Sequence, residues 1–224
     1  MEKITRLLDI LLSSIVLIIL SPLLLVVMVL LKLTGEGEIF YRQKRIGRHQ
    51  NAFYIIKFAT MLKNSSHIGA GSVTIRNDSR VLPLGKILRK TKLNEVPQIW
   101  NILIGEMSIV GPRPLMPKQF DYYSKSTKNL VTENRPGLTG IGSLIFRDEE
   151  SFFLSGTNSQ EIYKELISPS KALLEEWYVH NKSIRLYFKI IAITIVAVLV
   201  PKFDCCFLLD KKTERILNEL LGKH

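Results

Sequence analysis

The sequence is short of the residues from which several common kinds of site are built. Its only two cysteines, Cys205 and Cys206, are adjacent, which excludes a disulfide-stapled secreted domain. The four histidines are scattered without metal-ligand spacing, so a zinc site is not expected. A Walker loop, a GxGxxG stretch and a G-x-S-x-G elbow are also missing. The familiar nucleotide-binding loops and the α/β-hydrolase triad are therefore not expected.

Acidic residues are few relative to basic ones. Lys and Arg total 31 against 20 Asp and Glu, which gives a formal net charge of +11. The 224 residues are 46% hydrophobic, which is too apolar for a disordered chain and long enough for one domain with a small appendage. A basic, apolar chain is typical of a protein that lies on an anionic surface or holds anionic ligands. Nucleic acid is not expected as a partner, because no nucleic-acid-binding module is visible.

One uncharged stretch is long enough to anchor the chain in a membrane. Residues 10–31 are 22 residues without a charge, and as a helix they would extend about 33 Å, against about 30 Å of hydrocarbon core. A cleavable signal peptide fits poorly, because no small-residue cleavage site follows. Pro22, after Ser21, predicts a kink in the helix. Basic residues on both flanks favour a helix that enters and leaves on one face, although a spanning helix stays open.

The remaining pattern predicts an α+β fold that is mostly helical, with a small β-hairpin. Residues 38–62 have a hairpin pattern with a polar turn at 49–51, and 64–78 have no periodicity. The apolar run 190–201 is too short to span, so we expect an amphipathic interfacial helix there or a buried core helix. Further helices are expected at 81–90, 94–103, 114–125, 159–167 and 170–181, the last two separated by Ser168-Pro169. The expected organisation is an anchor at 1–33, a catalytic domain at 34–203 and a tail at 204–224.

The centre of the chain is basic and punctuated by prolines. Asn94 has the side chain of a helix N-cap, and Glu95 would then be stabilised by the helix dipole. That structural interpretation is complete by itself. The alternative is a phosphate site, because Arg89 precedes Glu95, Lys57 lies in an apolar strand, and Arg113 lies in a turn fixed by two prolines. In such a site Glu95 would hold Mg²⁺ together with phosphate oxygens.

Several segments in this region resemble the bacterial sugar transferases, the monotopic polyprenyl-phosphate phosphoglycosyl transferases. The resemblance covers nearly the whole chain. The matching segments are IFYRQKRIG, IIKFATM, LGKILRKTKLNEVPQIWNILIGEMSIVGPRP, RPGLTG and EEWYVHN. It implies a re-entrant anchor and a catalytic domain on the cytoplasmic face of the bacterial inner membrane. It also implies transfer of a sugar phosphate from a UDP-sugar to polyprenyl phosphate with release of UMP, dependent on Mg²⁺.

The resemblance also assigns roles to individual residues. Glu95 matches the glutamate of the family's Asp-Glu pair, in which the aspartate attacks the β-phosphate of the donor. The resemblance further implies that phosphates are bound by Lys57, Arg89, Arg113 and, on the nucleotide side, Arg147. It also implies a helix break at Ser21 and Pro22 and a rigid turn at Pro112 and Pro114. Glu175 occupies a position where the family often has an aspartate.

Asn94 departs from this pattern, because it stands where the family usually has the nucleophilic aspartate. An amide is a poor nucleophile and a weak metal ligand. Glu95 could be the nucleophile itself, or it could orient the lipid phosphate for direct displacement while Asn94 only forms hydrogen bonds.

The sequence therefore leaves two functions. The first is a phosphoglycosyl transferase that starts an envelope polysaccharide or glycoconjugate. The second is a catalytically impaired relative that binds substrate or recruits later glycosyltransferases, because of Asn94.

Overall fold

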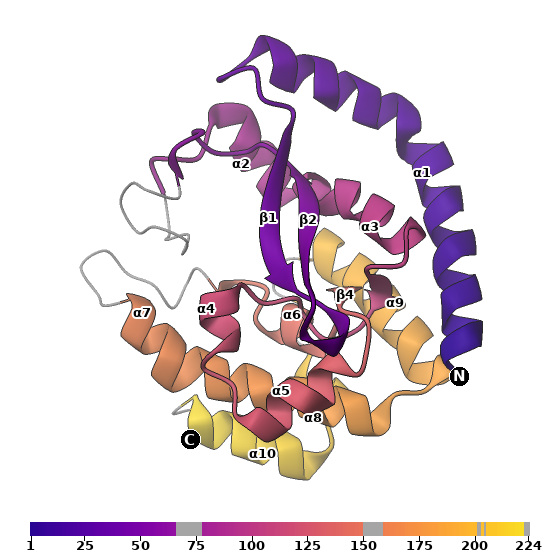
Figure 1. Cartoon of the computed structure of the whole chain (residues 1–224), viewed down its shortest axis with the longest axis vertical. Helices are drawn as coiled ribbons and strands as arrows, with labels where there is room; N and C mark the ends of the chain where they lie inside the picture. Colours follow the sequence, from indigo (N-terminus) through magenta and orange to yellow (C-terminus); the bar gives the residue numbers. More distant parts are fainter. Residues whose placement is uncertain (66–77, 150–158, 201–202, 204, 222–224) are drawn as a thin grey trace.

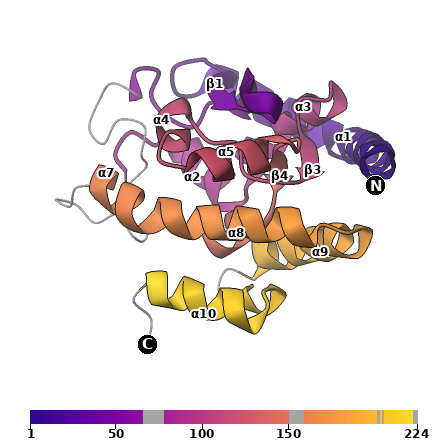
Figure 2. The ribbon, with the colours of Figure 1, turned by 60° about the horizontal axis from the view of Figure 1, so that its bottom comes forward.

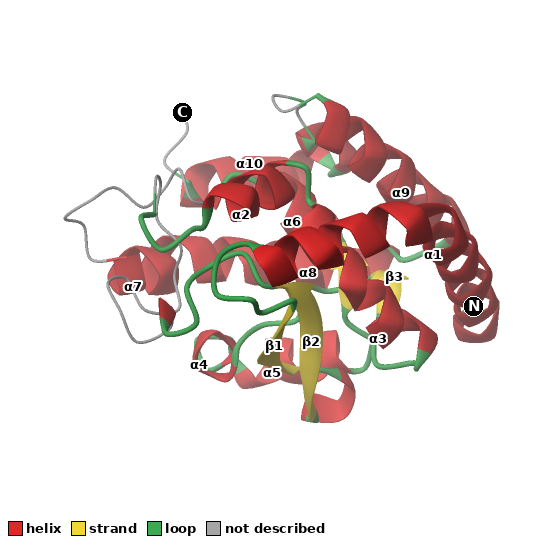
Figure 3. Ribbon diagram, turned by 90° about the horizontal axis from the view of Figure 1, so that it is seen from above, coloured by secondary structure: helices red, strands yellow, loops and turns green. Residues whose placement is uncertain are grey.

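We describe a computed structural model of the chain for residues 1–65, 78–149, 159–200, 203 and 205–221. The fold is mostly helical (Figures 1 and 3). The α-helices are α1 (Glu2–Leu33), α2 (Pro83–Lys90), α3 (Ile99–Leu103), α4 (Pro117–Phe120), α5 (Lys125–Thr132), α6 (Ile141–Ile145), α7 (Ser159–Ile162), α8 (Ser168–Asn181), α9 (Ile184–Leu199) and α10 (Lys211–Leu220). The short 3-10 and π segments are η1 (Arg48–Gln50), η3 (Leu93–Gln98), η5 (Tyr163–Ile167) and η6 (Cys206–Leu208).

The predicted hairpin is present. Strands β1 (Phe40–Ile46) and β2 (Ala52–Phe58) pair antiparallel and are joined through η1. Buried Phe53 and Ile55 of β2 pack with Ile102 of α3, which fixes the hairpin against the helical body. A second small sheet pairs β3 (Ser108–Val110) parallel with β4 (Gly137–Thr139).

Helix α1 continues through Pro22 and bends along its length (Figure 1). Pro22 has no N–H, so the carbonyl of Ile18 loses its usual helical donor. The Ser21 hydroxyl donates to that carbonyl at 2.9 Å and replaces the missing bond. By length and composition, α1 is the one described helix that could cross a membrane. The predicted anchor helix is therefore confirmed as a long apolar helix, and the Ser-Pro pair has a local structural role.

Both ends of α1 contact the globular body, while its middle does not. Asp9 and Ser13 are buried near the start, and Val27 and Leu31 are buried near the end. Ile18, between them, is 73% exposed. In Figure 1 the helix runs around one edge of the molecule from the N-terminus to the start of the hairpin.

The largest core cluster lies around α8 and α9. Leu174 of α8 and Ile190 of α9 are fully buried in it, and Leu217 of α10 joins the same cluster. Figure 2 shows α10 lying alongside α8. The segment after residue 204 thus contributes to the main core.

Helix α9 has two different faces. Tyr187, Ile190 and Ile193 are buried, whereas Ile195 and Leu199 are exposed. The buried face is that of a core helix, and the interfacial helix stays a prediction for the exposed apolar face.

Three local predictions are wrong. The single helix expected at 114–125 is two helices, α4 and α5, because the Ser124 hydroxyl accepts from the Thr127 N–H at 3.1 Å and starts a new helix. Ser168-Pro169 does not separate two helices, because the π segment η5 continues into α8 and the Ser168 N–H donates to the Tyr163 carbonyl.

Most of the irregular segment expected at 64–78 lies outside the described residues, so that prediction is not tested.

Asn94 is not an N-cap, which is the third error. The chain reverses at Lys92, whose φ is 59°, and then forms the 3-10 turn η3 before α3 begins at Ile99. The side chain of Asn94 makes no capping hydrogen bond, and its Oδ1 is buried without any hydrogen-bond partner in the described part of the chain. Gly105, with φ 91°, follows α3 as expected.

Candidate active site

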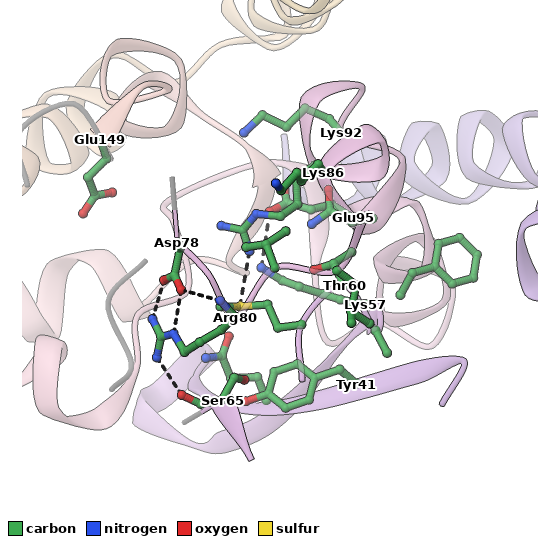
Figure 4. A pocket seen from close by; sticks show the side chains of 18 of the residues that line it. Tyr41, Lys57, Thr60, Ser65, Asp78, Arg80, Lys86, Lys92, Glu95 and Glu149 are labelled. Atoms are coloured by element: carbon green, nitrogen blue, oxygen red, sulfur yellow. Dashed lines mark hydrogen bonds and ion pairs between the residues drawn. The ribbon is translucent and has the colours of Figure 1, made fainter. Parts of the chain in front are cut away.

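A cavity of about 1100 Å³ brings most of the predicted site residues together. It is bordered by the hairpin, α2, η3, the turn at 111–114 and residues 146–149. Figure 4 shows some of the lining side chains, with Lys57, Lys86, Lys92 and Glu95 near one another and Glu149 apart from them. The predicted residues that line the cavity are Lys57, Arg89, Asn94, Glu95, Arg113 and Arg147.

Glu95 forms an ion pair with Lys57, and both residues line the cavity. β2 carries Lys57 and η3 carries Glu95, and the Lys57 Nζ lies 3.2 Å from Glu95 Oε1. Burial alone would raise the pKa of Glu95, but the charges of Lys57 and Arg113 outweigh it and lower the pKa to about 2. Burial lowers the pKa of Lys57 to about 8, against the opposing charge of Glu95. Glu95 is therefore an ionised carboxylate at neutral pH.

The turn at 111–114 is held at both of its prolines. The Pro112 carbonyl accepts from the Gly137 N–H at 2.8 Å, and the Pro114 carbonyl accepts from Arg45 Nη1 at 3.0 Å. A Cβ on Gly111 would meet a backbone oxygen at 2.5 Å, so only glycine fits there. The backbone on both sides of Arg113 is therefore fixed, which limits the positions that the Arg113 side chain can take.

Arg113 is fixed through its backbone and its side chain. Its N–H donates to Glu175 Oε1 at 3.1 Å, and its guanidinium donates to the Ser143 hydroxyl at 3.1 Å. Glu175 is 2% exposed, and its Oε2 has no partner among the described residues. Burial raises the pKa of Glu175 to about 7, although the Arg113 N–H and the charges of Lys171 and Arg113 act in the opposite direction.

The other two predicted phosphate-binding arginines lie at the edges of the same cavity. An Arg89 guanidinium nitrogen lies 3.6 Å from the sulfur of Met61. Arg147 donates to the Ala197 carbonyl near the end of α9. Ala197 and Val198 themselves line the cavity, so one edge of it is formed by the helix whose outer face is apolar.

The charged residues that line the cavity and that sequence reasoning missed include Arg45, Arg80, Glu149 and Lys171. Arg45 is 8% exposed, and burial lowers its pKa to about 10. Lys171 is 2% exposed and forms an ion pair with Glu149 at 2.6 Å. Helical spacing offered one signal, because Lys171, Leu174, Glu175 and Tyr178 share a face of α8 that is otherwise apolar.

Sequence reasoning missed Arg80 because neither this residue nor its partner Asp78 lies on a helix or strand with a readable pattern. It forms a two-point ion pair with Asp78, with N···O distances of 2.8 and 2.6 Å, and a third hydrogen bond joins it to the Ser65 carbonyl (Figure 4). Arg80 therefore links residues 65 and 78, and all three residues line the cavity.

A complete protein cage for a metal is missing from the described residues. They contain no cluster of three or more His, Cys, Asp or Glu side chains that could hold one. Asn94 Oδ1 is buried without a partner beside Glu95, and both residues line the cavity. Two neighbouring oxygen donors fit Mg²⁺ in the mode in which substrate phosphates supply further ligands.

Comparison with known proteins identifies the family of this chain. Residues 1–201 match the family described as bacterial sugar transferase. The chain therefore belongs to the bacterial sugar transferase family, as the resemblance of its motifs predicts.

Several named relatives match a large part of the chain. The exopolysaccharide production protein ExoY of Sinorhizobium fredii is 37% identical over 158 residues, which are 64% of this chain and 70% of ExoY. A UDP-glucose:undecaprenyl-phosphate glucose-1-phosphate transferase of Klebsiella pneumoniae is 36% identical over 62% of this chain and 30% of its own. An N-acetylgalactosaminephosphotransferase of Aeromonas hydrophila is 35% identical over 63% and 34%. This chain thus spans only about a third of these two longer relatives.

Proposed function

We propose that this protein transfers a sugar phosphate from a UDP-sugar to polyprenyl phosphate and releases UMP. The reaction breaks the anhydride bond between the two phosphates of the donor, and the lipid phosphate gains a new bond to the sugar phosphate. The product would start an envelope polysaccharide or glycoconjugate. The undecaprenyl-phosphate sugar phosphotransferases among the relatives support this assignment.

The observation that carries the proposal is the ionised Glu95 within a cationic wall. Lys57, Arg89 and Arg113 line the cavity around it and would bind the phosphates of donor and acceptor. Arg113 would carry most of this role, because its turn is fixed before any ligand arrives.

Two routes are compatible with Glu95. In the first, its carboxylate attacks the β-phosphorus, UMP leaves, and the lipid phosphate then displaces the carboxylate. In the second, Glu95 orients the lipid phosphate, which attacks directly. Mass measurement after mixing the protein with donor alone distinguishes the routes, because only the first adds a sugar phosphate to the chain.

We further propose that Mg²⁺ is required. Glu95, with the unpaired Asn94 Oδ1 beside it, would hold the ion together with donor phosphate oxygens. When bound, Mg²⁺ supplies positive charge that neutralises the charge developing on the phosphates. Chelation should therefore abolish turnover, and added Mg²⁺ should restore it.

We propose that α1 is a re-entrant anchor and that residues 34–203 form a catalytic domain on the cytoplasmic face of the inner membrane. The support is that Asp9 near one end of α1 and Leu31 near the other are both buried against the same body. A helix that crossed the bilayer would carry one end away from it. Single cysteines placed before residue 10 and after residue 31 test this: labelling from opposite faces would refute re-entry.

UMP release tests the activity. The detergent-solubilised protein is given polyprenyl phosphate, Mg²⁺ and UDP-glucose, UDP-galactose or UDP-N-acetylgalactosamine, beside its Asn94→Asp variant. Release by the natural sequence identifies the sugar and shows that Asp at 94 is dispensable. Release only by Asn94→Asp means that Asn94 holds the site inactive. UDP-sugar binding without release by either form favours the alternative, a substrate-binding partner for later glycosyltransferases.

A further inference from the structure

The cavity has a side lined by cations around Glu95 and a second side lined by aromatic rings around Glu149. Glu95 lies among Lys57, Arg89 and Lys92 on the first side. Glu149 lies apart from Lys57, Lys92 and Glu95 in Figure 4. Around Glu149 the lining includes Phe146, Tyr163 and Lys171.

Glu149 is held in place by a lysine that a ligand cannot easily reach. Its Oε2 accepts from Lys171 Nζ at 2.6 Å. Lys171 is 2% exposed, whereas the side chain of Glu149 is 23% exposed. The Lys171 Nζ also lies over the rings of Phe146 and Tyr163, at 5.6 and 5.2 Å from their centroids. Lys171 therefore orients the carboxylate, and Glu149 is the more accessible member of the pair.

The second carboxylate oxygen of Glu149 is available. Within the described ranges, Oε1 accepts no hydrogen bond from the protein. A fixed carboxylate with a free oxygen is a strong acceptor for a hydroxyl group, and it repels phosphate.

Arg113 lines the same cavity as Glu95 and Glu149. Burial lowers its pKa, but the charges of Glu95 and Glu149 raise it, with the net effect upward, so both acids act on this guanidinium. If the donor diphosphate binds Arg113 with its reacting phosphorus toward Glu95, a neutral part of the donor extends toward Glu149. Uracil presents two carbonyl acceptors and one N–H donor, whereas the ribose presents hydroxyl donors and a hexose presents several more. A carboxylate acceptor thus suits a sugar ring better than the base, and the hexose offers it more hydroxyl groups than the ribose does.

We propose that Glu149, oriented by Lys171, forms a subsite for the sugar of the donor and accepts a hydrogen bond from a hydroxyl group of that sugar. This inference rests on the proposed function. It assigns sugar discrimination to a residue outside the phosphate-binding group, within a family whose relatives are named for glucose, galactose and N-acetylgalactosamine.

The test is direct binding by calorimetry, without acceptor lipid, of UDP and of the three UDP-sugars. Removing Glu149 alone would leave Lys171 buried and unpaired, so the main variant is Glu149→Gln with Lys171→Met, which replaces the ion pair by neutral side chains of similar size. We expect its affinity for the preferred UDP-sugar to fall about 10-fold to 100-fold, with UDP binding unchanged. Glu149→Asp, which keeps a charge for Lys171, should lose affinity for the sugar to a smaller extent.

Two controls make the result specific. Asp121→Asn with Lys128→Met neutralises a surface ion pair, 3.6 Å in length, that lies outside the cavity, and it should bind both ligands normally. Deoxy analogues of the preferred UDP-sugar identify the hydroxyl: the natural protein should bind one of them weakly, and the double variant should not distinguish it from the parent sugar.

Equal binding of UDP-sugars by the natural protein and the double variant would overturn the subsite. So would an equal loss for UDP and UDP-sugar, which would place Glu149 at the ribose or in a structural role. Failure of the natural protein to bind UDP at all would instead overturn the proposed function, and the subsite with it. Binding that depends on Glu149 without any turnover would retain the subsite and refute only catalysis.

Discussion

The Tyr187 hydroxyl of α9 donates to Asp9 Oδ1 of α1 at 2.8 Å. The same carboxylate oxygen accepts from the Ile109 N–H of β3 at 2.9 Å. Asp9 is 2% exposed, so one buried acid joins the start of the anchor helix to a strand and to the helix at the edge of the cavity. The N-terminal end of α1 is therefore part of the globular body.

Loss of this junction should destabilise the whole chain. Asp9→Leu leaves the Tyr187 hydroxyl and the Ile109 N–H without an acceptor, and we expect it to lower the free energy of unfolding by about 2–4 kcal/mol. Tyr187→Phe leaves the Ile109 bond intact and should cost about 1–2 kcal/mol. Urea unfolding in detergent measures both, and equal small effects would show that Asp9 does not organise the junction.

The Ser21 hydroxyl should matter because of the proline that follows it. Ser21→Ala leaves the Ile18 carbonyl unpaired in an apolar setting, which should cost about 1–3 kcal/mol. Ser14→Ala, on the same helix but away from the proline, is the matched control. Adding Pro22→Ala to Ser21→Ala returns an N–H to the Ile18 carbonyl and should recover the stability. Persistence of the loss in that double variant would contradict the explanation.

Glu95 and Arg113 should be required for turnover but not for membrane association. We expect Glu95→Ala and Arg113→Ala each to reduce UMP release by about 100-fold or more, because each removes a charge from the phosphate site. Both variants should still partition into membranes, since neither residue lies on α1. Glu219→Ala, in an exposed ion pair of α10, serves as the control. Full activity of both cavity variants would refute the site.

Glu175 should make stability depend on pH. Burial raises its pKa from 4.5 to about 7, so the folded chain binds this proton more tightly than the unfolded chain. The free energy of unfolding should therefore fall as pH rises from about 4.5 to 7, by about 3 kcal/mol in total.

The Glu175→Gln variant should lack this decrease, and the difference between the two unfolding profiles isolates Glu175 from other titrating groups. Arg113, from its turn, and Lys171, on the same helix, are the cations that face Glu175, and Tyr123 and Tyr178 lie within reach of its charge. Parallel profiles would mean that Glu175 has the same pKa in the folded and the unfolded chain.

Local signals in the sequence were reliable where one element decides the structure. The hairpin follows from apolar alternation in 40–58 and the turn residues between, and the fixed turn at 111–114 follows from its prolines and glycine. Asn94 failed as a cap because the chain turns at Lys92, two residues earlier, and packing of η3 against β2 then buries the amide. The pairs that join distant segments, Glu149 with Lys171 and Asp9 with Tyr187, have no local signature.

The edge of the cavity formed by α9 has a consequence for the lipid substrate. Ala197 and Val198 line the cavity, and the next residue, Leu199, is 75% exposed. If the bilayer lies against this apolar face, as the proposed function implies, a polyprenyl phosphate would place its headgroup beside the cations while its chain stays among the lipid tails. Pulling that chain into water would cost about 0.8 kcal/mol for each methylene exposed. Transfer at this edge would therefore leave the polyprenyl chain within the hydrocarbon core of the membrane.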